Sequence, residues 1–589
     1  MTGVFEMEKK YYTIERNVQI VISLLKAHGI RKVIASPGTT NMTFVGSIQN
    51  DPFFKIYSSV DERSAAYLAC GMAEESGEPV VISCTGATAS RNYMSGLTEA
   101  YYRKLPILAI TSHRGTQAIG HLIDQQIDRR QIPNDIAMES VTVPLVKNST
   151  DENFCVIEAS KAILALKQNG GGPAHINLFT AYNPDFSVRD LPPVRVIKRF
   201  TKNDNLPDIS GFERIAIFVG SHHNFTAEET AAIDKFCATH DAVVFTDHTS
   251  GYRGKYEVNF PLVCCQKNYR SSLANVDLLI HIGEVSGCYR VKPIKSVWRV
   301  SEDGALRDTF GKLTNVFQMP EKDFFEYYSK DDASETSYLK ACQEEYQKFL
   351  DQMPEIPFGN IWMAKQMAPK LPKGCELHMG IFNSLRSWNF FPLPEGIYSK
   401  CNVGGFGIDG GVSSMMGASL ANPKKLFVGV FGELAFFYDM NVAANRHIGK
   451  NVRLMVINNG RGTEFRNYDH PCYIFGEEAD PYMAAAGHFG NKSFDLLKHY
   501  ATDLGYEYLS ASNKEEFLKV VDRFLTPEIT DKPIILEAFT DTQDESDALE
   551  TVMNYMVDSK IAVKKEMKNL AKNMLGQKGI KFLKKAMGK

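Results

Sequence analysis

Short apolar runs alternate with helical stretches along the N-terminal third of the chain. Val18 to His28 has helical spacing, and Lys32 to Ala35 is a strand-length run that ends in a Ser-Pro-Gly turn. Pro79 to Ser83 and Ile107 to Thr111 are further runs of strand length. Strands that alternate with helices predict a parallel sheet covered by helices on both faces.

The same rhythm continues through most of the 589 residues, a length that suits about three domains. A connector with two prolines, 190–196, ends the first stretch, and a charged segment, 329–352, precedes the third. We therefore expect an α/β protein of three successive doubly wound parallel-sheet domains. The expected domains span residues 1–189, 197–330 and 355–545.

Composition narrows the class of protein. No run approaches the ~20 apolar residues of a membrane helix, and the first 17 residues are too polar for a signal peptide. The 11 cysteines form no CxxC pair, which is typical of a reducing compartment and argues against structural zinc. We therefore expect a cytoplasmic protein.

The net charge of −3 hides a basic tail, because residues 559–589 contain ten lysines and one glutamate. The acidic remainder argues against nucleic-acid binding by the body of the protein. Apolar residues three and four apart between Ile561 and Leu575 predict a basic amphipathic helix. Peripheral contact with an anionic membrane or an acidic partner is one reading. A solvated helix packed on its own protein, or a disordered tail, is the other.

Two polar motifs follow neighbouring apolar runs in the third stretch. Phe431-Gly432-Glu433-Leu434 comes first, and Asn458-Asn459-Gly460-Arg461-Gly462 comes second. A carboxylate and an amide oxygen at adjacent strand ends can supply two hard ligands to Mg²⁺, and the glycines allow a diphosphate to approach. Each motif alone could be an ordinary strand-to-helix turn, but the pair at this spacing favours a site.

Together the motifs resemble the Gly-Asp-Gly…Asn-Asn signature of thiamine-diphosphate enzymes. The Gly-Glu-Leu form is most similar to a Gly-Asp-Leu variant in the 2-succinyl-5-enolpyruvyl-6-hydroxy-3-cyclohexene-1-carboxylate synthases of menaquinone biosynthesis. The resemblance implies thiamine diphosphate and Mg²⁺ as cofactors. The metal ligands would be the side chains of Glu433 and Asn459 and the carbonyl of Arg461. Gly432, Leu434 and Asn458 would lie against the cofactor.

This signature departs from the family pattern in two ways. Glutamate stands where the family has aspartate at 433, and 23 residues separate the half-motifs, about one fewer than usual. We expect the longer side chain to compensate for the shorter connection.

A second acidic residue, Glu62, follows a strand-length run and opens a helix rich in small residues. On its own, such a residue is most simply a helix-terminal charge. The resemblance implies that Glu62 is the catalytic glutamate, which shares a proton with the aminopyrimidine of the cofactor. That role needs a carboxyl shielded from water, because burial raises its pKa.

Further residues follow the family in order and spacing, although each alone is more simply a turn residue. By resemblance, the first domain binds the pyrimidine, the central domain is often structural, and the third binds the diphosphate. The resemblance places Arg114 and Gln125 in the active-site cleft and Ile408 as the apolar support that bends the cofactor. Four more residues would contact the cofactor: Gly38, Gly86, Asn383 and Ser384.

The residues expected near the substrate depart further from the family pattern. The synthases carry Ser-Arg where this chain has Thr39-Thr40, and a second arginine where it has Val403. Such arginines hold carboxylates through bidentate bonds. Arg386 could occupy a shifted, related place. The departures suggest a paralogue with altered substrate. A neutral or hydroxylated acceptor is one reading of Thr39, Thr40 and His113, and simple packing is another.

We therefore expect a thiamine-diphosphate- and Mg²⁺-dependent 2-oxo acid decarboxylase or carboligase that transfers a fragment to an acceptor. The family's shared active site implies a homodimer or homotetramer. The synthase activity itself is one alternative. A catalytically silent cofactor-binding scaffold is another, although a scaffold has no need of Glu62.

Overall fold

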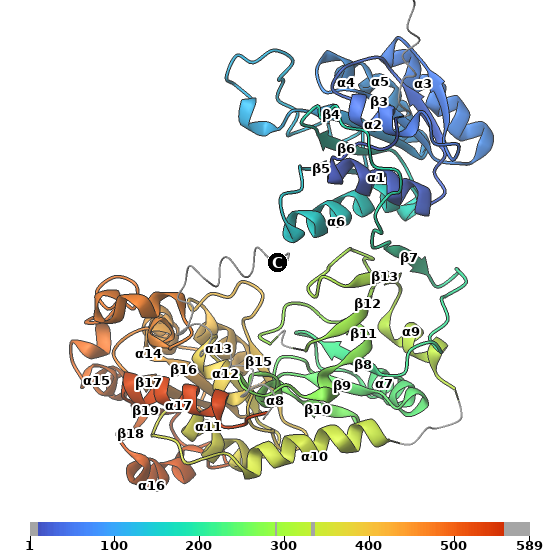
Figure 1. The fold of residues 1–589 in the computed structure, drawn as a ribbon. Helices are drawn as coiled ribbons and strands as arrows, with labels where there is room; N and C mark the ends of the chain where they lie inside the picture. The colour runs from blue at the N-terminus through green and yellow to red at the C-terminus, as the bar shows by residue number, and fades with distance from the viewer. Residues whose placement is uncertain (1–9, 289–290, 331–335, 559–589) are drawn as a thin grey trace, which may run out of the picture. The chain divides into compact units, whose positions relative to one another are not determined.

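The computed structural model describes residues 10–288, 291–330 and 336–558 (Figure 1). The predicted basic tail, 559–589, lies outside the described residues. The chain divides into two compact units. The first comprises residues up to 204 together with Gly304–Gln318, and the second comprises residues 205–303 and those from 319 onward.

The first unit is built on a six-stranded sheet of order β2-β1-β3-β4-β6-β5, with parallel pairing. Its strands are β1 (Lys32–Ala35), β2 (Lys55–Ser58), β3 (Val80–Thr85), β4 (Ile107–His113), β5 (Glu139–Val143) and β6 (Ala174–Phe179). Its helices are α1 (Arg16–Ala27), α2 (Met42–Ile48), α3 (Glu62–Ser76), α4 (Thr88–Asn92), α5 (Met94–Arg103) and α6 (Ser149–Ala165). A further parallel pair, β7 (Lys198–Thr201) with β13 (Leu313–Gln318), belongs to this unit.

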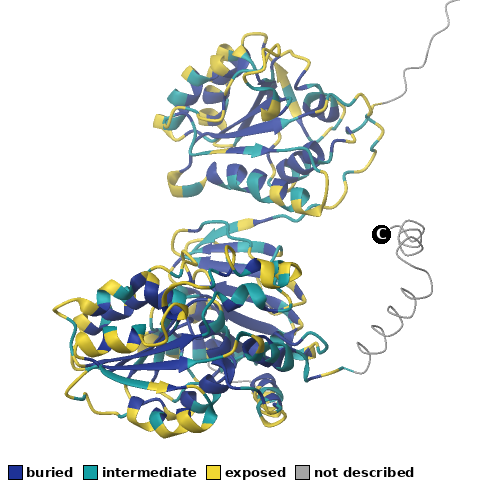
Figure 2. Cartoon of the chain, turned by 90° about the vertical axis from the view of Figure 1, so that its left-hand side faces the viewer, coloured by how far each residue is buried: buried dark blue, intermediate teal, exposed yellow. Residues whose placement is uncertain are grey.

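Alternate residues of each strand point to opposite faces of the sheet, and both faces are apolar. Helices therefore cover both faces. Val81 and Leu108 belong to the core that contains residues of α1 and α6. Their chain neighbours Ile82 and Ala109 belong to a second core with residues of α3 and α5. Both cores are apolar, which explains why the strands are apolar runs without polar alternation (Figure 2).

The second unit holds two parallel-stranded regions. The first contains β8 (Ile215–Val219), β9 (Val243–Thr246), β10 (Glu257–Asn259), β11 (Val276–Ile282) and β12 (Ile294–Ser301), in the order β10-β9-β8-β11-β12. Its helices are α7 (Ala227–His240), α8 (Pro261–Cys264), α9 (Glu321–Tyr328) and α10 (Ser337–Asp351). A capping box between Thr226 and Glu229 starts α7.

The C-terminal region of this unit is a six-stranded parallel sheet of order β15-β14-β16-β17-β19-β18. Its strands are β14 (Glu376–Met379), β15 (Tyr398–Cys401), β16 (Phe427–Gly432), β17 (Val452–Asn458), β18 (Glu507–Ala511) and β19 (Ile534–Phe539). Its helices are α11 (Asn360–Met367), α12 (Asn383–Trp388), α13 (Gly411–Ala421), α14 (Glu433–Asp439), α15 (Leu496–Asp503), α16 (Lys514–Phe524) and α17 (Thr542–Asn554).

These parallel sheets confirm the predicted fold class of three α/β domains. The strand β7 and the strand β13 fall within the predicted central stretch, 197–330, yet cluster with the first unit. Among the described residues, no helix has both the length and the apolarity needed to cross a membrane.

The two cores predict how the first unit responds to truncation. Leu108 is fully buried between the sheet and its helices, so Leu108→Ala should lower the free energy of unfolding by about 2–5 kcal/mol. Phe154 on α6 is 47% exposed, and Phe154→Ala should cost about 0.5 kcal/mol or less. Urea unfolding of both variants tests this, and equal losses would contradict the assigned core.

Candidate active site

Four neighbouring strands of the C-terminal sheet end at one edge, because parallel strands share a direction. Each strand end leads into a segment that the sequence singled out. The strand β14 leads to Asn383 and Ser384, β15 to Ile408, β16 to Glu433, and β17 to Asn459. The register pairs Gly432 with Ile457, so the two predicted metal-binding motifs begin side by side.

Glu433 is the most unusual residue at this edge. Its side chain is 3% exposed, and its Oε1 has no hydrogen-bond partner within the described chain. Burial raises the pKa of this carboxyl to about 8, although backbone N–H groups of Asn459 and Arg461 oppose the shift. A buried carboxyl oxygen without a hydrogen-bond partner costs folding free energy unless a ligand binds it.

The two adjacent asparagines play different parts. Asn458 is 3% exposed, and its Nδ2 donates to Glu537 Oε1 at 2.7 Å while its Oδ1 accepts from the Gly460 N–H at 3.2 Å. The Oδ1 of Asn459 is buried and has no partner in the described chain. The predicted contact of Asn458 with a cofactor would therefore come from its backbone, whereas Asn459 offers a side-chain oxygen.

These residues fit a magnesium ion. Glu433 and Asn459 each present a buried oxygen without a partner, and carboxylate and amide oxygens are ligands that Mg²⁺ prefers. The side chain of Arg461 forms an ion pair with Asp480, which leaves only its backbone for the predicted metal contact. Within the described ranges no three His, Cys, Asp or Glu side chains cluster as a metal site. Magnesium would thus need oxygens from a diphosphate and water to complete its shell.

A second buried carboxyl lies in the electrostatic field of Glu433. Glu545, in the first turn of α17, is 5% exposed and accepts the Asn360 N–H on both oxygens at 3.1 and 3.0 Å. Thr540 Oγ1 donates to its Oε1 at 2.9 Å. Burial raises the pKa of Glu545 to about 7, and the charge of Glu545 contributes to the raised pKa of Glu433.

The segment after β14 combines an unusual backbone angle with several side-chain hydrogen bonds. Phe382 has a φ of 64°, in the left-handed region, and Ser384 is buried. Arg386 donates to Asn383 Oδ1 at 3.0 Å and forms two 2.9 Å bonds with the carboxylate of Glu464. Ile408 is half-buried and packs against the core beneath the sheet edge.

In the first unit, Glu62 is the first residue of α3, after the N-cap Asp61. Its side chain is half-buried, and its Oε2 accepts a 3.1 Å hydrogen bond from Asn92 Nδ2 at the end of α4. The shielding from water expected for Glu62 is therefore only partial within one chain.

The two predicted glycines of this unit lie in close contacts. A Cβ on Gly38 would come within 1.9 Å of Thr85 Cγ2, and a Cβ on Gly86 within 2.4 Å of the Ser112 carbonyl oxygen. Both glycines therefore allow loops at the carboxyl ends of β1 and β3 to pack closely.

Arg114 and Gln125 lie on one exposed loop. Arg114 pairs with Asp124 at 3.3 Å, and Gln125 is exposed with a φ of 57°. The loop thus brings these two residues together, while Glu62 contacts α4.

Comparison with known proteins adds a class to this geometry. Residues 16–132 match the family described as thiamine pyrophosphate enzyme, N-terminal TPP binding domain. The match lies within the first unit, and the three parallel sheets are consistent with the fold of a thiamine pyrophosphate enzyme.

Several curated relatives carry one name. The chain is 29% identical over 553 residues to the 2-succinyl-5-enolpyruvyl-6-hydroxy-3-cyclohexene-1-carboxylate synthase of Bacteroides thetaiotaomicron, and the alignment covers 90% of this chain and 96% of the relative. The synthase of Phocaeicola vulgatus is 28% identical, over 91% of this chain and 98% of the relative. That of Flavobacterium psychrophilum is 27% identical, over 89% and 96%.

Sequence reasoning missed several residues of the site. Each of them contacts a partner that is distant in the sequence. Asn92 is 30 residues from Glu62, Glu464 is 78 residues from Arg386, and Glu545 is 185 residues from Asn360. Contacts at such separations leave no periodic pattern in the sequence. The position of Glu545 in a first helical turn is a signal only for capping.

The raised pKa of Glu545 predicts a pH dependence of stability. Its pKa rises from an ordinary 4.5 to about 7 on folding, so its contribution is complete below about pH 4.5 and is lost as pH rises through 7. Between pH 5 and pH 8, Glu545→Gln should therefore gain up to about 3 kcal/mol of unfolding free energy relative to the wild type. Urea unfolding at both pH values measures this gain.

The control is Glu550→Gln on the same helix, where the carboxylate is 41% exposed. That variant should follow the wild-type pH profile. A Glu545→Gln profile parallel to that of the wild type would show that this carboxyl is not desolvated.

Proposed function

We propose that the protein is a thiamine-diphosphate- and Mg²⁺-dependent enzyme that removes CO₂ from a 2-oxo acid and transfers the remaining fragment to an acceptor or protonates it. The observation that carries the proposal is the pair of buried, unpartnered oxygens of Glu433 and Asn459 at adjacent strand ends. Two such oxygens are hard to explain by folding alone, since each costs free energy unless it is bound.

Each residue has a defined part in this proposal. Glu433, Asn459 and the carbonyl of Arg461 would hold Mg²⁺, and Asn383 and Ser384 would position the diphosphate. When bound, thiamine diphosphate would supply the electron sink that stabilises the carbanion left by CO₂ loss. Glu62 would hold a proton against the aminopyrimidine, with Asn92 Nδ2 orienting its Oε2.

The partial burial of Glu62 supports an assembly of two or four copies. Apolar residues near it are exposed in the single chain: Val60 by 80%, Tyr67 by 47% and Leu68 by 53%. A second copy that covers this surface would shield Glu62 from water, as the proposed proton transfer requires.

The synthase activity named for the relatives is the second candidate. Identity of 28–29% over nine tenths of the chain supports it. Thr40 and Val403 speak against it, because the resemblance calls for arginines at these two positions. Supplying isochorismate with 2-oxoglutarate and measuring CO₂ release separates this candidate from an altered substrate.

The metal site gives the first test of the proposal. Glu433→Gln and Asn459→Ala should each weaken the Mg²⁺-dependent binding of thiamine diphosphate by about tenfold or more. The first change removes the negative charge of one ligand, and the second removes the other ligand. Titration calorimetry with and without Mg²⁺ measures the loss. Glu477→Gln, an exposed position nearby, is the matched control. Wild-type protein that takes up no thiamine diphosphate in Mg²⁺ would end the proposal.

The proton relay gives the second test. Glu62→Gln should lower CO₂ release from an accepted 2-oxo acid by about 100-fold or more, while thiamine diphosphate still binds. Glu75→Gln, an exposed change on the same helix, should keep the wild-type rate. Decarboxylation at full rate by Glu62→Gln would rule out the mechanism.

A further inference from the structure

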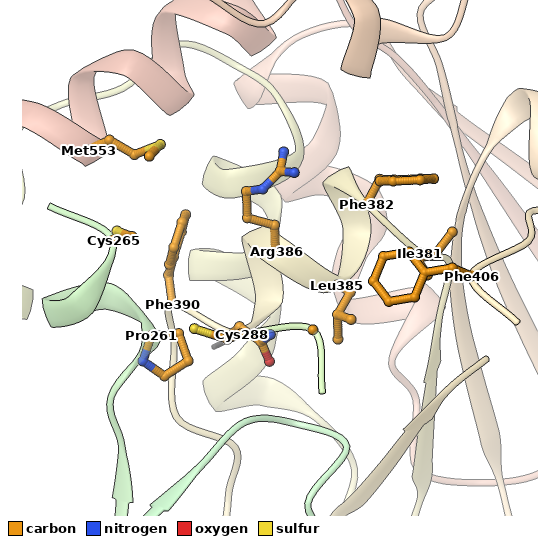
Figure 3. Close-up of a pocket in the computed structure, with 12 residues that line it drawn as sticks. Pro261, Cys265, Cys288, Ile381, Phe382, Leu385, Arg386, Phe390, Phe406 and Met553 are labelled. Atoms are coloured by element: carbon orange, nitrogen blue, oxygen red, sulfur yellow. The ribbon is translucent and has the colours of Figure 1, made fainter. Parts of the chain in front are cut away.

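A cavity of about 140 Å³ lies within the second unit, beside α12. Its walls come from α8, from the segment before residue 289, from the loops after β14 and β15, and from α17 (Figure 3). The loops after β14 and β15 are the same ones that carry Asn383, Ser384 and Ile408. The cavity therefore borders the part of the site where the proposed cofactor would lie.

Apolar side chains form one part of the lining. Ile381, Phe382, Leu385, Phe390, Phe406 and Met553 contribute side chains. The rings of Phe382 and Phe406 meet edge to face, with centroids 5.8 Å apart. In Figure 3 these two rings stand together on one side of the cavity, and Phe390 and Met553 stand on the other.

Both phenylalanines are held in an unusual backbone conformation. Phe382 has a φ of 64° and Phe406 a φ of 56°, which bulky residues rarely adopt. Their side chains are nevertheless 37% and 41% exposed, so burial of the rings in the single chain does not account for this conformation. Strain of this kind concentrates at ligand sites.

Among the described residues that line the cavity, only Arg386 carries a permanent charge, and that charge is already paired. Arg386 forms two 2.9 Å bonds with Glu464, and Asn467 Nδ2 donates to the same carboxylate at 3.1 Å. A bidentate pair occupies N–H groups along one edge of the guanidinium, so a ligand carboxylate that binds at this edge would have to displace Glu464. The buried Asn389 is also engaged, because its Oδ1 accepts the His248 N–H at 2.9 Å.

We propose that this cavity receives the apolar substituent of the substrate, so that the enzyme prefers 2-oxo acids with an aromatic or branched aliphatic side chain. This inference rests on the proposed function, since it assigns the substrate class of the same site. A cavity of about 140 Å³ is close to the size that receives a benzene-sized group. A second carboxylate, as in 2-oxoglutarate, would lose part of its hydration against these rings without gaining an unpaired cation among the described lining residues.

Binding of two probes tests the preference. We would titrate phenylpyruvate and 2-oxoglutarate into the full chain with Mg²⁺ and thiamine diphosphate, in the Glu62→Gln background so that neither is consumed. Phenylpyruvate should bind at least about tenfold more tightly. Tighter binding of 2-oxoglutarate would overturn the inference.

Two substitutions connect the preference to the cavity. Phe406→Ala should weaken phenylpyruvate about tenfold and leave 2-oxoglutarate unchanged, whereas Phe154→Ala, at a 47% exposed position of the first unit, should change neither. Glu464→Gln leaves the Arg386 charge without its carboxylate and should strengthen 2-oxoglutarate about tenfold. Circular dichroism melts confirm that each variant folds. Equal effects of Phe406→Ala and Phe154→Ala would contradict the assigned pocket.

A CO₂-release assay with the wild type separates failure of this inference from failure of the proposed function. Release from 2-oxoglutarate but not from phenylpyruvate keeps the function and overturns the inference. Selective binding of phenylpyruvate without any CO₂ release keeps the pocket and overturns the function.

Discussion

A buried carboxyl group with one unpaired oxygen is the constraint on which this site depends. Glu433 is 3% exposed, and one of its oxygens is unpaired within the described chain. Placing such a group in a dry environment costs several kcal/mol when it is charged, so the protein raises its pKa or supplies a cation. The unpaired oxygen of Asn459 beside it favours the cation, since an amide cannot relieve its own desolvation by changing protonation state.

Parallel pairing is what brings these oxygens together. The half-motifs are 23 residues apart in sequence, but β16 and β17 are neighbours in register, so their following residues emerge at one edge. The neighbouring strands β14 and β15 add the segments with Asn383 and Ile408 to the same edge. A one-residue slip between β16 and β17 would displace the pair by a full strand step of about 3.3 Å, which is longer than a metal–oxygen bond of about 2.1 Å.

Much of this edge could be predicted from the sequence, because apolar runs and the turns after them are local signals. Glu433 and Asn459 each follow such a run, so their position at strand ends was readable. The different hydrogen bonding of Asn458 and Asn459 could not be predicted. It depends on Glu537, which lies on β19, 79 residues after Asn458. The hydrogen bond from Asn92 to Glu62 likewise depends on how α4 packs beside α3.

The charged residues near the proposed substrate could also be predicted only in part from the sequence. The sequence showed that Thr40 and Val403 stand where the synthases carry arginines, and both are buried, at 4% and 2% exposed. It left Arg386 as a possible replacement. The structure shows that Glu464 occupies that guanidinium in a bidentate pair. An anionic substituent would therefore meet no uncommitted guanidinium at any of these places, and its lost hydration would oppose binding. The substitutions in the sequence and the ion pair in the structure thus both support the proposal of a less charged substrate.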